Sequence, residues 1–111
     1  QAMWLMCQQE RPDDYVIATG KQFSVKEFCV LAASFFNFEI EWQGSGLDEL
    51  GIDKKSGRII FAIAERYFRP AEVETLLGDP SKAKKILGWE PEHTFTSLVE
   101  EMAIAASKAV I

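Results

Sequence analysis

Apolar residues along this chain recur with two periods, and each period predicts its own kind of element. A spacing of three to four residues predicts helices over 1–9, 24–37 and 80–88 and a last helix that begins at Thr94 or Thr96. β-branched or alternating runs predict strands over 15–19, 39–43 and 58–64. The resulting order is helix, strand, helix, strand, strand, helix, helix, which indicates an α+β fold.

Helix boundaries carry explicit signals. Ser24 and Glu27 form a capping-box pattern, in which a hydroxyl and a carboxylate satisfy free backbone N–H groups. Asp79 is placed to cap a later helix whose first position is Pro80 and which ends at Gly88. These signals fix the two helices independently of their apolar faces.

Two predicted elements have no evident packing partner among the other predicted elements. The opening helix is apolar on nearly every face, with Met3, Trp4 and Cys7 among its residues, so it should be buried on more than one side. Tyr15–Thr19 has the continuous apolar character of a strand buried on both faces, as in a parallel sheet. Because the chain also begins without an initiator methionine or a helix cap, we expect a longer parent protein.

The glycine-punctuated segment 44–57 is expected to be a long hairpin connection between strands. A phosphate-binding loop would need a buried strand before it and a capped helix after it. The strand before it alternates polar and apolar residues, and no strong helix pattern follows. The segment therefore does not predict a nucleotide loop.

Composition narrows the function classes. With 48% hydrophobic residues in 111, the chain should bury a sizeable core, and its net charge of −5 argues against a general nucleic-acid binder. No run reaches the roughly 20 apolar residues that span a bilayer, and no secretory signal is present, so a cytoplasmic location is expected. Cys7 and Cys29 are expected as buried free thiols, and the single histidine, His93, has no partner at metal-ligand spacing.

The run from Arg66 to Pro80 carries the candidate chemistry. Tyr67 and Phe68 are expected to bury the turn, and Pro70 suits the first position of a short helix. On such a helix Arg69 and Glu72 stand three residues apart, so they could pair with each other or face one ligand. Glu72 and Glu74 would point to different faces, which leaves no acid–base partner for either.

Several stretches of this chain match one known family. They are 3–6, 14–20, 24–28, 66–80, 82–84 and 87–89. In these the chain resembles the C-terminal part of the GDP-mannose 4,6-dehydratases, which are extended short-chain dehydrogenases/reductases. It departs from the family at Ala64-Glu65, where Asp-Pro is usual, and at Ser97, where an acidic residue is common.

The resemblance implies that residues 1–111 form a C-terminal substrate-binding portion. The NADP-binding Rossmann part would precede it, and Tyr15–Thr19 would be a late strand of that part's sheet. The family uses NADP to oxidise the sugar at C4, eliminates water across C5 and C6, and returns the hydride to C6. Arg69 would contact the diphosphate or ribose of GDP, and Glu72 the ribose.

The family's catalytic residues do not occur here. No Tyr-x-x-x-Lys is present, since Tyr15 is followed four places later by Thr19 and Tyr67 by Ala71. The resemblance therefore implies no catalytic or cofactor-binding residue in this chain, and no NADP bound to it alone. Its expected partners are GDP-mannose, the missing N-terminal domain and further copies of itself.

Two other readings remain open. The chain could be a stand-alone interaction module that uses its apolar opening helix and orphan strand to dimerise. It could also belong to a related dehydratase that acts on another nucleotide sugar, because no guanine-reading residue is identifiable.

Overall fold

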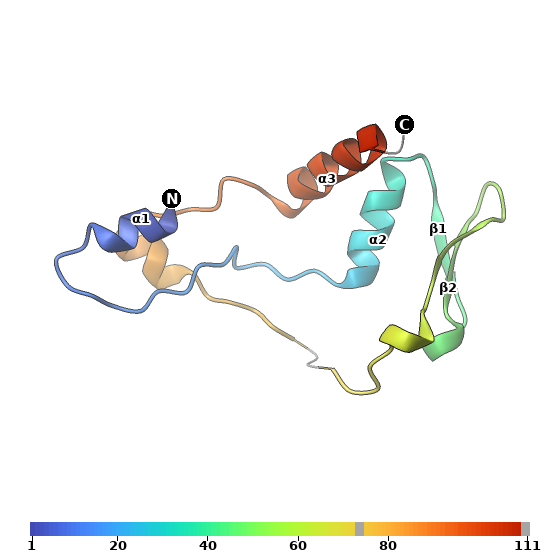
Figure 1. Ribbon diagram of the computed structural model, residues 1–111, viewed down its shortest axis with the longest axis horizontal. Helices are drawn as coiled ribbons and strands as arrows, with labels where there is room; N and C mark the ends of the chain where they lie inside the picture. The colour runs from blue at the N-terminus through green and yellow to red at the C-terminus, as the bar shows by residue number, and fades with distance from the viewer. Residues whose placement is uncertain (73–74, 110–111) are drawn as a thin grey trace. The chain divides into compact units, whose positions relative to one another are not determined.

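The computed structural model describes residues 1–72 and 75–109, which form two compact units (Figure 1). Unit 1 comprises Gln1–Gln22 and Glu74–Phe95, and unit 2 comprises Phe23–Val73 and Thr96–Ile111. Helices and a small antiparallel sheet are both present, in agreement with the α+β class.

Unit 1 is built on the contact between α1 (Ala2–Cys7) and η3 (Ala83–Leu87), a segment in π-helical geometry. The Asp79 carboxylate accepts hydrogen bonds from the backbone N–H and the hydroxyl of Ser81, as expected of a cap. Gly88 ends the turn at φ +65°, a left-handed conformation that glycine adopts without strain. The predicted helix over 80–88 is therefore present, mostly in π rather than α geometry.

The predicted strand over Tyr15–Thr19 is not formed within the described residues. The segment is not hydrogen-bonded into a sheet, and Val16 is 53% exposed and Ile17 43% exposed. A strand needs a neighbour whose backbone groups it can pair with, and the described part of unit 1 supplies none. Its place in the sheet of another domain remains a prediction.

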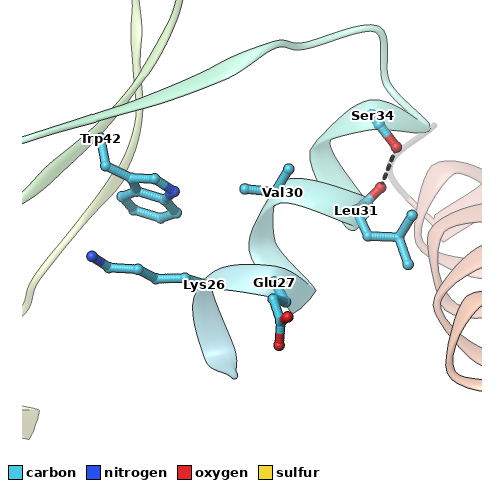
Figure 2. A pocket seen from close by; sticks show the side chains of 6 residues that line it. All are labelled: Lys26, Glu27, Val30, Leu31, Ser34 and Trp42. Carbon is cyan, nitrogen blue, oxygen red and sulfur yellow. Dashed lines mark hydrogen bonds between the residues drawn. The ribbon is translucent and has the colours of Figure 1, made fainter. Parts of the chain in front are cut away.

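Unit 2 contains α2 (Val25–Ser34) and nearly all of α3 (Phe95–Ala109), which lie beside each other in Figures 1 and 2. The capping box is complete, because Glu27 N–H donates to Ser24 Oγ at 3.1 Å and Ser24 N–H donates to the Glu27 carboxylate. Residues 35–37 close α2, and Asn37 takes φ +64°. α2 begins directly after Ser24, as its capping box predicts, and α3 begins at Phe95, next to the predicted start at Thr94 or Thr96.

The sheet of unit 2 has three antiparallel strands in the order β1–β2–β3. They are β1 (Ile40–Gln43), β2 (Leu50–Asp53) and β3 (Ile59–Ala62), with the short 3-10 turn η1 (Gly46–Asp48) between the first two. The expectation of one long connection over 44–57 is wrong, since β2 lies inside it. The predicted element order is wrong at the same point.

Gly51 is the reason that the sequence pattern does not predict β2. It pairs with Trp42 on one side and Phe61 on the other, and these two rings stack with centroids 5.9 Å apart. A Cβ at Gly51 would lie 3.0 Å from the Trp42 ring, 3.1 Å from Phe61 and 3.2 Å from Ile40. The glycine that suggests a turn is therefore required by close side-chain packing in a strand.

Three further expectations are corrected. The buried hydrophobic residues among those described are mostly small, so the core is not sizeable; they are Ala33, Ala83, Leu87, Val99 and Ala103. Tyr67 is 70% exposed and Phe68 is 43% exposed, so neither anchors the turn. The short helix predicted to begin at Pro70 is not formed as far as Glu72, because the backbone there only bends.

In residues 1–72 and 75–109, no helix has the length and apolar character to cross a membrane.

Candidate functional site

Arg69 and Glu72 are brought together in unit 2. Arg69 Nη1 donates to Glu72 Oε1 at 3.3 Å, although the two residues stand on a bend and not on the expected helix. Their side chains are 77% and 60% exposed, so the pair lies in solvent. Glu74, the other acid of this run, lies outside the described residues.

The segment before this pair carries a second arginine, Arg66, three residues before Arg69. β3 ends at Ala62 and leads to the 3-10 turn η2 (Glu65–Tyr67), whose geometry is held by Tyr67 N–H donating to Ala64 O. The Arg66 guanidinium lies 4.8 Å from the centroid of the Tyr67 ring, within cation–π range. The segment therefore presents two arginines, one stacked on a ring and one paired with a carboxylate.

The described residues of unit 2 also contain an open hollow of about 410 Å³ (Figure 2). Figure 2 shows Trp42 of β1 opposite Val30 and Lys26 of α2, with Leu31 and Ser34 further along the helix. Lys26 Nζ lies 2.5 Å from Glu49 Oε1 and 5.4 Å from the Trp42 ring centroid, so its charge is already paired. No sequence pattern predicts this hollow, and the four-residue spacing of Lys26 and Val30 is its only local signal.

Asp53 is the buried carboxylate of the sheet, at 3% exposure. Its Oδ2 accepts from the Ser56 hydroxyl at 2.6 Å and from Ser56 N–H at 3.0 Å, and its Oδ1 accepts from Glu39 N–H at 3.0 Å. The Ser56 hydroxyl, followed by the Glu39 backbone N–H, lowers the pKa of Asp53 from its ordinary value. With its acceptors used by the turns, Asp53 joins the strands and offers little to a ligand.

Lys82 of unit 1 contacts two side chains of the segment 13–15. Its Nζ lies 2.8 Å from Asp13 Oδ2 and 5.2 Å from the centroid of the Tyr15 ring. The ion pair raises the pKa of Lys82 and lowers the pKa of Asp13. Lys82 therefore ties the 13–15 segment to the start of η3.

Cysteine and metal chemistry find little support in the described residues. Both cysteines are free thiols, but Cys7 is exposed and only Cys29 is partly buried, which raises the pKa of its thiol. The expectation of two buried thiols is thus wrong for Cys7, because the helix face that carries it is uncovered. Within residues 1–72 and 75–109, no three His, Cys, Asp or Glu side chains gather as metal ligands would.

Comparison with known proteins decides the family. The model of the family described as GDP-mannose 4,6 dehydratase matches residues 1–102 of this chain. The chain belongs to this family. GDP-mannose 4,6 dehydratase 2 of Caenorhabditis elegans is 53% identical over 102 residues, which are 92% of this chain and 26% of that protein. The GDP-mannose 4,6-dehydratases of Yersinia enterocolitica and Vibrio cholerae are 50% and 51% identical over 109 residues, in each case 89% of this chain and 29% of the relative.

The chain thus spans between a quarter and a third of the length of these dehydratases. The stretch matched by the family model includes Arg69 and Glu72, all of unit 1, and unit 2 as far as residue 102. The family assigned from the sequence is confirmed, while the roles of Arg69 and Glu72 remain predictions.

The described residues do not fit the NADP that the family resemblance leads us to expect. A dinucleotide site needs a glycine-rich turn between a buried strand and a helix N-terminus. The only glycine-rich segment here contains η1 and strand β2, and Gly51 is packed between Trp42 and Phe61. We therefore assign no residue of this chain to the cofactor.

Proposed function

We propose that this chain is the substrate-side portion of a GDP-mannose 4,6-dehydratase, in which Arg69 and Glu72 bind the GDP part of the substrate. The observation that carries the proposal is the pair's geometry within a family-matched segment. The whole protein would convert GDP-mannose to GDP-4-keto-6-deoxymannose and water, with NADP held by another part of the polypeptide. This chain would supply binding and orientation and no catalytic residue.

The contacts of Arg69 leave room for a phosphate. A guanidinium has five N–H donors in a planar fork, and Glu72 engages Nη1 at 3.3 Å. Among the described residues no other partner of the Arg69 side chain is found, so the remaining donors can form charge-assisted bonds to phosphate oxygens. The carboxylate of Glu72 orients the fork and can accept from a ribose hydroxyl.

Exposure is consistent with this assignment. A surface ion pair contributes only about 0–1 kcal/mol to stability, so holding Arg69 against Glu72 does little for the fold. Pro70 restricts the backbone between them, which reduces the entropy lost when the two side chains are ordered by a ligand. The pair is therefore better suited to bind than to stabilise.

The test uses a hybrid protein in which residues 1–102 of this chain replace the matching stretch of the C. elegans dehydratase. Titration calorimetry with GDP would be compared for Arg69→Ala, Arg69→Lys and Glu72→Gln. Loss of a charged hydrogen bond costs about 1.5–3 kcal/mol, so Arg69→Ala should weaken GDP binding about 10- to 100-fold. The GDP affinity of Arg69→Lys should lie between that of Arg69→Ala and that of the unmodified hybrid, because the point charge of lysine replaces the planar guanidinium.

Arg58→Ala is the matched control, since it removes the same charge from an exposed position of unit 2. We expect its GDP affinity to equal that of the unmodified hybrid. If Arg69→Ala and Arg58→Ala bind GDP within about twofold of each other, the assignment of Arg69 is wrong. UDP should bind more weakly than GDP; equal binding would favour a dehydratase for another nucleotide sugar.

A further inference from the structure

Arg66 is the cation of the run from Arg66 to Pro80 that the proposed function leaves without a role. It stands three residues before Arg69, and its guanidinium carbon lies 4.8 Å from the centroid of the Tyr67 ring. The ion pairs found among the described residues involve other cations, which are Lys26, Arg69 and Lys82. Within residues 1–72 and 75–109, no carboxylate therefore balances the positive charge of Arg66.

Arg69 and Glu72 together carry no net charge. Arg69 Nη1 lies 3.3 Å from Glu72 Oε1, so an anion that approaches this guanidinium also approaches the carboxylate. Because Coulomb energy falls only with the inverse of distance, repulsion from the carboxylate offsets much of the attraction to the guanidinium. The diphosphate of a nucleotide sugar carries two negative charges, and balancing them requires a further cation beside the pair.

The stack on Tyr67 orients the Arg66 guanidinium without using its hydrogen-bond donors. A cation–π contact engages the flat face of the guanidinium, while its five N–H groups point outward in the plane. In the part of the chain that the structure describes, the ring contact is the one interaction found for the Arg66 side chain. The N–H edge of Arg66 is thus available for charge-assisted hydrogen bonds to phosphate oxygens.

The backbone keeps the two arginines close enough to bind one diphosphate. Arg66 stands in the 3-10 turn η2 (Glu65–Tyr67), which is closed by Tyr67 N–H donating to Ala64 O at 3.0 Å. Three residues of fully extended chain span at most about 10 Å, so the Cα atoms of Arg66 and Arg69 lie within that distance. Two long side chains on such a short segment can converge on adjacent phosphates.

We propose that Arg66 is a second diphosphate-binding residue, which supplies the net positive charge that the Arg69–Glu72 pair lacks. The ligand class is a nucleoside diphosphate or its sugar ester. The inference rests on the proposed function for the location of the site, and it goes further by dividing the roles of the two arginines. Arg69 is oriented by Glu72 near the ribose, while Arg66 balances the charge of the diphosphate.

The test uses the hybrid protein and titration calorimetry with GDP and with GMP. Arg66→Gln should weaken GDP binding about tenfold, as expected for the loss of a charged hydrogen bond, and should weaken GMP binding less, because GMP has one phosphate fewer. Arg66→Lys keeps the charge and should bind GDP within about threefold of the unmodified hybrid. The GDP affinity of Arg66→Gln should also vary less with salt concentration, because one screened attraction is removed.

Arg58→Gln is the matched control for this series. Arg58 is an exposed arginine that directly precedes β3, whereas Arg66 follows that strand. The four residues of β3 alone span about 13 Å, so the two arginines stand at opposite ends of it. The affinity of Arg58→Gln for both nucleotides, and its salt dependence, should equal those of the unmodified hybrid.

Equal GDP affinity of Arg66→Gln and Arg58→Gln would overturn the proposal. A loss that Arg66→Lys does not restore would also overturn it, because charge would then not be the cause. If Arg69→Ala weakens GDP binding and Arg66→Gln does not, only the role of Arg66 is removed; the reverse result keeps that role and removes the role of Arg69. A hybrid that is folded yet binds no GDP would overturn both this proposal and the proposed function.

Discussion

Arg69 Nη1 and Glu72 Oε1 lie 3.3 Å apart on a bend in which both side chains are mostly exposed. The three-residue spacing that suggested a helix face instead brings the two together across Pro70. The pair is thus formed without the helix, and its exposure makes it a weak contributor to stability.

The first prediction follows from that exposure. Arg69→Ala should change the free energy of unfolding of the hybrid protein by less than about 1 kcal/mol, because exposed ion pairs contribute about 0–1 kcal/mol. Urea denaturation followed by circular dichroism measures this directly. A loss of several kcal/mol would show that the pair is structural, and any loss of GDP affinity would then be indirect.

The second prediction concerns Gly51. Gly51→Ala places a Cβ about 3 Å from the rings of Trp42 and Phe61, so the aromatic stack must shift. Overpacking of this kind typically costs 1–3 kcal/mol. Hydrogen exchange of the β2 amides in the full chain measures the cost, and Gly57→Asn is the control, because a Cβ there meets nothing within 4 Å and asparagine tolerates its positive φ. If β2 exchanges equally in both variants, the packing role of Gly51 is wrong.

These elements show what the sequence could and could not specify. The capping box at Ser24, the alternation of β1 and the periodicity of α3 are local signals, and the structure confirms the elements they predict. The segment that contains Gly51 was wrongly predicted to be a connection, because a glycine is equally typical of a turn and of a strand position where side chains of neighbouring strands pack closely. The burial of Tyr67 was misjudged because burial depends on what covers a side chain, which no local pattern contains.

The third prediction concerns acid. The pKa of Asp53 is lowered in the folded state by Ser56 and by the Glu39 backbone, so its carboxylate stabilises the sheet fully above its unfolded pKa of about 4. That contribution is lost as the pH falls through the lower, folded pKa. The ¹H–¹⁵N signals of Ile52 and Asp53 should therefore report unfolding of the sheet below about pH 4.

Asp53→Asn should be less stable at pH 7 and should show a weaker acid dependence, because an amide cannot accept all three hydrogen bonds and does not titrate. An identical acid profile in the variant would mean that another carboxylate controls the sheet.

The fourth prediction concerns the start of α2. Ser24→Ala removes the acceptor of the Glu27 N–H and should cost about 1 kcal/mol, which appears as roughly fivefold faster exchange of the Glu27 and Phe28 amides. Ser34→Ala, at the other end of the helix, should have little effect, because its hydroxyl only donates back to the Leu31 carbonyl. Equal changes at the two amides in both variants would exclude a capping role.

The most direct test of the account is the dehydratase activity of the hybrid, in which residues 1–102 of this chain complete the C. elegans protein. We predict that the hybrid, purified with NADP, converts GDP-mannose to GDP-4-keto-6-deoxymannose, and that Arg69→Ala raises its KM while Arg58→Ala does not. A hybrid that unfolds at the same temperature as the C. elegans dehydratase yet forms no 4-keto product would contradict the proposal that this chain is the substrate side of such an enzyme.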